Sequence, residues 1–193
     1  MSEVPAYRER DEAPGERRHL SLALANSRRN TPEGPLDELA SPASLRAWLS
    51  ARGFEQIGRC GPAQVVEFRL LRDAIRELLE ARIQQRLPER TAVALVNRAA
   101  SAAPSVSQLR WDAGGPPEVV DRPGGRGTAV ARAVIAADAI ELIAGEEHAD
   151  LRACGAPGCV RLLLRDHPRR QWCSTRCGDR VRASRYYHRH RDG

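Results

Sequence analysis

Residues 154–177 read CGAPGCVRLLLRDHPRRQWCSTRC, and this stretch decides the fold of the C-terminal part of the chain. It contains four cysteines in two close pairs, Cys-x4-Cys and Cys-x3-Cys, separated by thirteen residues. Two short loops with this spacing can bring four thiolates to one tetrahedral centre, as a structural zinc site requires. Four thiolate ligands leave no open position for water, so the predicted role is structural and not catalytic. The predicted Zn²⁺ ligands are Cys154, Cys159, Cys173 and Cys177.

The residues around the cysteines predict the local fold. Residues 160–165 and 169–172 flank an Asp-His-Pro turn, so we expect two short strands that bring the cysteine pairs together. Ser174 is a typical N-cap for the helix expected to follow it. A knuckle, a hairpin and a helix around one zinc ion resemble a treble-clef finger. Because a module of about 40 residues buries too little surface to fold alone, its folding is expected to depend on the metal.

The charge of the chain is concentrated around this predicted site. Residues 151–193 contain eleven Arg and three Asp, a net charge of +8, whereas residues 1–150 carry −2. Every basic residue of the chain is Arg, so only the clustering of Arg is informative and not its use in place of Lys. A strongly basic segment predicts a polyanionic partner.

The predicted C-terminal helix carries the basic residues at regular intervals. Arg182, Arg185 and Arg189 follow i, i+3, i+7 spacing, so three guanidinium groups can line one face and reach successive phosphates. Tyrosines nearby could hydrogen-bond a phosphate or stack on a base. The alternative is a solvated basic tail. The predicted nucleic-acid contacts are Arg176, Arg180, Arg182, Arg185, Tyr186, Arg189 and Arg191.

Length and composition favour one ordinary domain followed by a small module. The chain has 193 residues, of which 41% are hydrophobic, enough for a core in the larger part. No apolar run approaches the roughly 20 residues that cross a bilayer, and no membrane partner is expected. The first residues have no signal-peptide core, and clustered cysteines suit a reducing compartment, so a cytoplasmic location is expected.

The larger part is predicted to be mainly helical with a small β-hairpin, which makes the fold class α+β. We expect residues 1–18 to be a disordered lead-in, residues 19–150 to form the main domain and residues 151–193 to form the finger. Residues 19–26 fit a strand or a helix equally well. The three tryptophans are expected to anchor the core. Helices are expected at 42–53, 64–86, 89–102 and 128–144, and a hairpin at 106–111 and 118–122.

A polar group near the start of the main domain has two interpretations. Asn26 and Ser27, next to Arg28, could line a pocket for a small anionic effector. Alternatively, Asn26 only caps a turn, which is the commoner role of such a residue. Cys60 has no partner in the sequence and is expected to be a structural or free thiol.

The finger resembles a known family, the CGNR zinc finger. The resemblance rests on the string WCSTRCGDR at residues 172–180 and the basic run that follows it. The signature itself reads Cys177-Gly178-Asp179-Arg180, so Asp replaces the family's Asn and a side-chain hydrogen-bond donor is lost. The metal ligands are unaffected by this change.

The rest of the chain resembles the ABATE domain, which precedes this finger in bacterial proteins described as stress-induced transcription regulators. The family's opening pattern, close to Leu-x-Leu-Asp-x-x-Asn-Thr, corresponds to LSLALANS at residues 20–27, with Ala23 and Ser27 replacing Asp and Thr. Residues 36–39 and 44–49 also fit the family. The resemblance extends over about residues 19–191 and implies a transcription regulator.

Together these observations predict a DNA-binding transcription regulator that is not an enzyme. Because one small finger reads few base pairs, specific binding would need a homodimer or a second contact surface. An RNA-binding or ribosome-associated module is a second interpretation, since Arg and Tyr also hold single strands. A third is a ligand-binding or enzymatic domain with a zinc-stapled tail, although no nucleophile elbow, phosphate loop or His/acid cluster is found.

Overall fold

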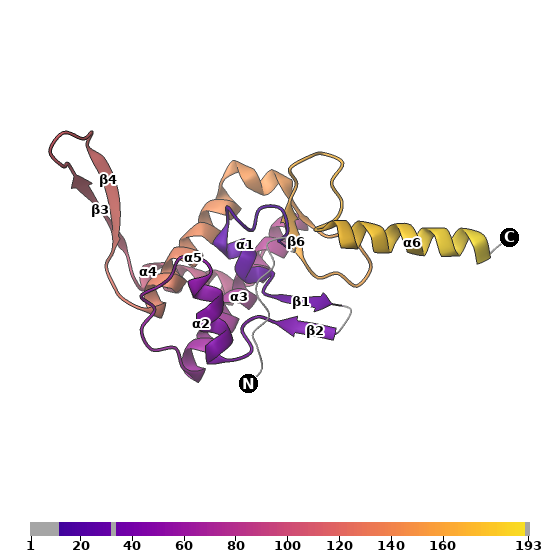
Figure 1. Cartoon of the computed structure of the whole chain (residues 1–193), viewed down its shortest axis with the longest axis horizontal. Helices are drawn as coiled ribbons and strands as arrows, with labels where there is room; N and C mark the ends of the chain where they lie inside the picture. Colours follow the sequence, from indigo (N-terminus) through magenta and orange to yellow (C-terminus); the bar gives the residue numbers. More distant parts are fainter. Residues whose placement is uncertain (1–11, 32–33, 192–193) are drawn as a thin grey trace.

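Helix α3 (Pro62–Ile83) lies at the centre of the computed structural model, which describes residues 12–31 and 34–191, without the side chains of 121–123 and 187–191. The helix starts at Gly61, whose N–H donates to Gln64 Oε1 at 2.9 Å, and Pro62 occupies the first turn. The helix corresponds to the one expected at 64–86, and its apolar stripe is buried: Val65, Phe68, Leu71, Ile75 and Leu79. The helix therefore supports the other elements along one continuous face (Figure 1).

Four further helices surround α3. The ambiguous segment near residue 20 is helix α1 (Leu20–Ala25), with five of its six residues buried. Ser41 caps α2 (Pro42–Ser50) by accepting a hydrogen bond from the Ser44 N–H at 3.1 Å, as predicted. The Ala-rich helix α5 (Thr128–Ala144) contacts α1, α3 and α4 (Arg90–Ser101). Its small side chains let these helices approach closely, and Ala131, Ala136 and Ala139 are completely buried.

The strands form three separate antiparallel hairpins. Strands β1 (Arg28–Thr31) and β2 (Gly34–Asp37) pair Arg28 with Asp37. Strands β3 (Ser105–Arg110) and β4 (Glu118–Pro123) form the predicted hairpin, which projects away from the helices (Figure 1). Strands β5 (Leu151–Ala153) and β6 (Leu162–Leu164) are joined to α5 by the 3-10 turn Glu146–Asp150.

The β5–β6 pairing corrects the predicted hairpin of the finger. We expected strands at residues 160–165 and 169–172, but the partner of β6 precedes the first cysteine, and residues 169–172 form no strand. Leu151, Leu162 and Leu164 join the main core, whereas Leu163 packs on the cysteine side. The hairpin thus links the two cores because alternate side chains of a strand point to opposite faces.

Several other expectations need correction. Residues 12–18 are not a disordered lead-in: they form turns, and Ala13 and Glu16 are buried, while residues 1–11 lie outside the described residues. Trp111 is not a core anchor, since it is 69% exposed beside the β3–β4 hairpin. The fold class is confirmed: a mostly helical N-terminal part with small hairpins precedes a hairpin and a helix, α6 (Thr175–Arg191), around four cysteines.

Candidate metal centre and nucleic-acid interface

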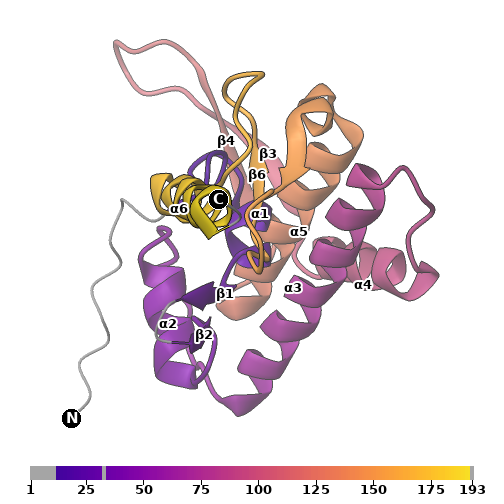
Figure 2. The same cartoon turned by 90° about the vertical axis from the view of Figure 1, so that its right-hand side faces the viewer.

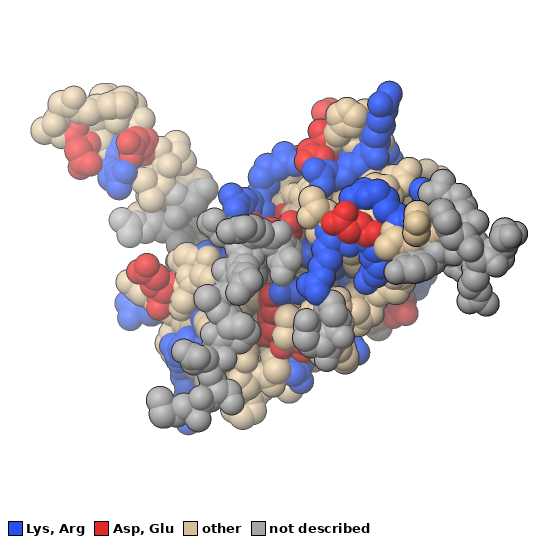
Figure 3. Space-filling model, turned by 45° about the vertical axis from the view of Figure 1, so that its right-hand side comes forward, with Lys and Arg blue, Asp and Glu red and all other residues tan. Residues whose placement is uncertain are grey.

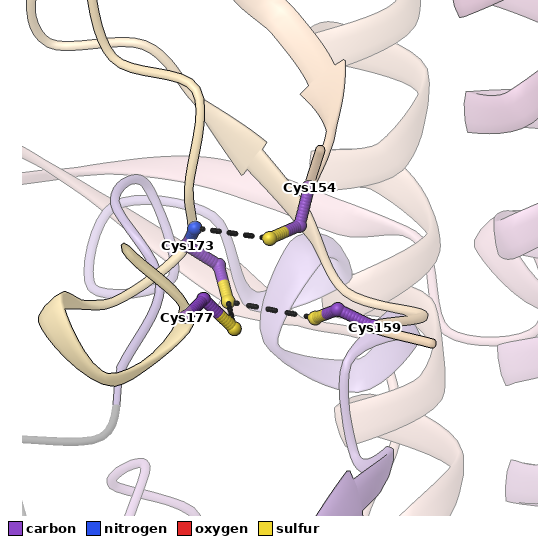
Figure 4. A group of neighbouring side chains, drawn as sticks. All are labelled: Cys154, Cys159, Cys173 and Cys177. Atoms are coloured by element: carbon purple, nitrogen blue, oxygen red, sulfur yellow. Dashed lines mark hydrogen bonds between the residues drawn. The ribbon is translucent and has the colours of Figure 1, made fainter. Parts of the chain in front are cut away.

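The four predicted zinc ligands come together at the start of α6 (Figure 4). Their sulfur atoms all lie within 4.8 Å of one another, with Sγ–Sγ distances of 3.7 Å from Cys159 to Cys173 and 3.6 Å from Cys173 to Cys177. Zn–S bonds of about 2.3 Å in a tetrahedron place sulfur atoms about 3.8 Å apart. The cluster therefore has the size and donor set of a four-thiolate zinc site, and it holds structural Zn²⁺.

Two local structures hold the cysteines in place. The turn between β5 and β6 contains the first pair: the Cys159 N–H donates to Ala156 O at 3.0 Å, and Gly158 adopts a φ of +70°, which favours glycine. The start of α6 holds the second pair, where Ser174 Oγ accepts the Cys177 N–H at 3.2 Å. The Cys173 N–H donates to Cys154 Sγ at 3.3 Å and so joins the two structures.

The four sulfur atoms can all be thiolates only with a cation between them. Cys154, Cys173 and Cys177 are buried, and the neighbouring thiols lower the pKa of Cys154 by donating hydrogen bonds to its sulfur. The same interaction raises the pKa of Cys159 to about 11, because its proton is held against the Cys154 sulfur. Four thiolates at these distances would repel one another strongly. A divalent metal removes this repulsion, so binding it displaces the protons.

The glycine and aspartate of the signature have structural roles. A Cβ atom on Gly178 would lie 3.2 Å from both the Trp172 ring and a guanidinium nitrogen of Arg182, so this position has little room for a side chain. Asp179 Oδ1 accepts a hydrogen bond from Arg182 at 2.6 Å. The negative charge that replaces the family's Asn is therefore paired with an arginine of the same helix.

The arginine of the signature lies against the metal cluster. Arg180 Nη2 is 3.9 Å from Cys177 Sγ, so its positive charge faces a zinc ligand. Contacts of this kind from outside the ligand set help to stabilise thiolates. The sequence predicted a nucleic-acid role for Arg180 but did not indicate this contact with a zinc ligand.

The predicted nucleic-acid residues lie on two faces of α6. At 100° per residue, Arg182 and Arg185 share an outward face, whereas Arg176 and Arg180 face the cysteine cluster and β1. All four are exposed, and Tyr186 is 54% exposed. The side chains of Arg189 and Arg191 lie outside the described residues. Figure 3 shows many basic and fewer acidic side chains on the face of the molecule near the finger.

Asn26 and Ser27 do not have free polar groups for a small anion. Both are buried, and the Asn26 amide donates to Glu16 at 2.7 Å and to Leu162 O at 2.8 Å while its oxygen accepts the Leu162 N–H at 2.8 Å. Ser27 Oγ accepts from Arg72 at 3.3 Å, and Arg28 is exposed on β1. Asn26 thus joins α1 to the finger strand β6.

Sequence reasoning missed two features of the main domain. Glu16, placed in the lead-in, forms a buried ion pair of 2.8 Å with Arg161, and burial raises the Glu16 pKa despite this arginine. A recess of about 1090 Å³ lies between residues 53–59 and the start of α5, with Arg59 and Arg126 in its wall. Residues 125–127, a glycine-rich segment, form part of that wall. No periodicity or spacing indicates either feature.

Comparison with known protein families gives two matches, one to each part of the chain. The ABATE family model, described as "Putative stress-induced transcription regulator", matches residues 18–146. The CGNR zinc finger model matches residues 151–190, including all four cysteines. No curated protein matches the chain. Both resemblances inferred from the sequence are confirmed.

Proposed function

Because the chain belongs to the ABATE family of transcription regulators and ends in a CGNR zinc finger, we propose that it regulates transcription by binding DNA through this finger. The observation that carries the proposal is the net charge of +8 in residues 151–193 against −2 in the rest of the chain. Arginines supply the counterion release that drives most nucleic-acid binding. Zinc holds the start of α6 in place, so these charges are presented on a fixed helix.

The outward face of α6 is the proposed contact with the phosphates. Arg185 has no carboxylate partner among residues 12–31 and 34–191, whereas Arg182 is paired with Asp179. Arg185 is therefore the stronger of the two proposed phosphate contacts, and Asp179 weakens the other. The proposed role is regulatory and not enzymatic, in line with the description of the family, and a zinc ion with four thiolate ligands has no open position at which to activate a water molecule.

The proposal is tested by the salt dependence of binding to a duplex of about 20 base pairs. We expect R182Q/R185Q to bind more weakly and its slope of log K against log salt to fall by about 1 for each phosphate that the variant no longer binds. The matched control is R90Q/R98Q, which removes the same charge from α4. Unchanged binding by R182Q/R185Q would contradict the proposal.

A second variant tests Asp179 by a gain of binding. D179N restores the family's Asn and leaves Arg182 without its carboxylate partner, so affinity for DNA is expected to rise by about threefold to tenfold. Competition between the duplex and single-stranded RNA distinguishes a DNA-binding protein from an RNA-binding one, for which exposed Tyr186 would be a stacking surface. Preference for RNA would replace the DNA proposal.

Three further proposals concern the oligomeric state, an effector and the location of the protein. A homodimer would give one small finger a longer binding site, and the β3–β4 hairpin, with Leu109, Trp111 and Val119 exposed, offers it an apolar surface. Sedimentation of the protein and of W111S tests whether the protein is a dimer and whether Trp111 contributes to it.

An effector of the main domain would bind in the recess beside α5. A thermal-shift screen of small anions tests this proposal. A cytoplasmic location suits the zinc-bound thiolates.

One finding bears on membranes. None of the helices in the described ranges, 12–31 and 34–191, is both long and apolar enough to cross a bilayer.

A further inference from the structure

A cleft of about 380 Å³ separates β1 of the ABATE domain from the first two turns of α6. Its two walls therefore come from segments more than a hundred residues apart in the sequence, and Figure 2 shows β1 near the start of α6. Asn30 Nδ2 donates to Gly158 O at 2.9 Å and so joins β1 to the turn that holds the first cysteine pair. The residues that line the cleft include Arg29, Asn30, Thr31, Arg161, Arg176 and Arg180.

The charge in this cleft is not balanced within the described residues. Arg29 is paired with Glu38 at 2.5 Å, and Asp179, an acidic residue in the wall, is paired with Arg182. Arg176 and Arg180 have no carboxylate partner in the described ranges. Arg180 also faces the sulfur of Cys177, so part of its charge offsets the zinc ligands. The cleft retains a positive charge, of which Arg176 is the least compensated source.

The cleft wall also contains a buried arginine. Arg161 is 6% exposed and lines both this cleft and a smaller recess beside α3, and its Nη2 donates to Glu16 at 2.8 Å. Its Nε has no hydrogen-bond partner in the described part of the chain. An unsatisfied buried donor costs about 1–3 kcal/mol, so such groups are normally satisfied by water or a ligand. Because Arg161 is paired with Glu16, it adds little net charge to the cleft.

The groups around the cleft suit a phosphate. Guanidinium groups bind phosphate oxygens with two parallel hydrogen bonds. The Asn30 amide has a second N–H besides the one donated to Gly158 O, whereas the Thr31 hydroxyl already donates to Gly34 O at 2.9 Å. The start of α6, a helix of 17 residues, adds the positive end of its dipole. A carboxylate would also be attracted by the positive charge of the cleft. A phosphate is tetrahedral and has more acceptor oxygens, so it can accept hydrogen bonds from several directions.

We propose that the cleft binds a backbone phosphate of the nucleic acid, so that the ABATE domain and the finger form one continuous binding surface. The inference rests on the proposed function and extends it to β1, which lies outside the finger. A nucleic-acid phosphate is favoured over a free one because the cleft adjoins the outward face of α6, where Arg182 and Arg185 lie. The protein would then bind phosphates on both sides of α6 at the same time.

The experiment measures duplex binding by the full-length, zinc-loaded protein over about 50 to 300 mM salt. R176Q should bind about threefold to tenfold more weakly at about 100 mM salt, with its slope reduced by about 1. R98Q, which removes an equal charge from α4, should stay within about twofold of the unmodified protein. Zinc content and circular dichroism confirm that each variant is folded.

Asn30 provides a matched pair on the ABATE side. N30A and N30D both lose the hydrogen bond to Gly158, but only N30D places a negative charge in the wall of the cleft. A phosphate in the cleft predicts that N30D binds DNA at least about fivefold more weakly than N30A. A purely structural role for Asn30 predicts equal affinities for the two variants.

The outcomes separate this inference from the proposed function. If R182Q/R185Q weakens binding while R176Q matches R98Q and N30D matches N30A, the cleft is not part of the surface and the inference is wrong, although the finger still binds DNA. If R176Q loses binding of inorganic phosphate and keeps its affinity for the duplex, the cleft is a free-phosphate site and the inference is also overturned. If the unmodified protein shows no salt-dependent binding, both proposals fail.

Discussion

The β3–β4 and β5–β6 hairpins of this chain have opposite surroundings. The first pairs six residues on each strand, yet every residue of β3 is exposed. The second pairs only three, yet all three residues of β6 are buried. Isolated two-stranded hairpins are marginal in water, so the number of paired residues does not decide which hairpin is more stable. Leucines in the main core, the hydrogen bonds of Asn26 and the zinc site stabilise the shorter one.

This difference has a functional consequence. The β5–β6 hairpin positions the metal ligands because it is held from both faces, and α6 and its arginines start from the same cluster. The β3–β4 hairpin projects at the opposite end of the molecule from α6 (Figure 1). The basic helix α6 is therefore attached at its start, through the cysteine cluster that the β5–β6 hairpin positions.

Removal of the metal should affect the two hairpins most differently. Structural zinc contributes about 10–16 kcal/mol of binding free energy in finger peptides, so chelation or C173S should expose the amides of β5, β6 and the start of α6 to hydrogen exchange. The amides of β3 and β4 should be unaffected. The control is C60S, since Cys60 lies outside the cluster. Continued protection of β5–β6 without zinc would contradict a metal-dependent finger.

Truncating one leucine in each hairpin tests the same contrast through packing. Leu164 is 2% exposed and joins the main core, so L164A should lower the free energy of unfolding by about 2–5 kcal/mol. Leu109 is 68% exposed, and L109A should change it by no more than about 0.5 kcal/mol. Urea denaturation measures both. Equal losses would mean that the β3–β4 hairpin is covered in solution.

Asn26 tests the polar attachment of β6 to α1. N26A leaves the Leu162 N–H and C=O without their side-chain partner, and each unsatisfied buried group costs about 1–3 kcal/mol. We expect a total loss of about 2–3 kcal/mol in urea denaturation. N30A, which removes one exposed hydrogen bond, should cost less than about 1 kcal/mol. A neutral N26A would show that α1 and β6 are held by apolar contacts alone.

The smallest effect is expected near the end of α3, the helix that contacts β5. Hydrogen bonds from Arg86 and from the Glu89 N–H lower the pKa of Glu77 to about 2. Because this pKa is lowered from 4.5, the stabilisation is present above pH 4.5 and is lost as the pH falls toward 2. Glu77 is close to solvent, so the contribution is below about 1 kcal/mol.

E77Q provides the measurement. The difference in unfolding free energy between E77Q and the unmodified protein should be largest near neutral pH and should shrink at about pH 3. Taking the difference at each pH removes the effect of protons on the zinc ligands, which both proteins share. A difference that grows on acidification would have the wrong sign for a lowered pKa.

The elements differ in how far the sequence predicts them. The long helices have periodic stripes and clear caps, so α3, α5 and the start of α2 lie close to their predicted positions. Residues 20–25 alternate apolar side chains and remained ambiguous, because a short segment buried on all sides has no periodicity to distinguish a helix from a strand. In α4, Val96 is buried but Val93 is 37% exposed, because the packing of α4 against α3 and α5 decides which face of the helix is buried.

The metal ligands, the basic helix and the family could be predicted from the sequence, because spacing, charge and signature residues are local properties of the chain. Three features became visible in the fold alone: β5 pairs with β6, Asn26 and Glu16 attach the finger to the main domain, and Asp179 pairs with Arg182. The cleft between β1 and α6 is likewise a tertiary feature. Each depends on which distant segments meet, and that depends on packing and on the need to satisfy buried polar groups.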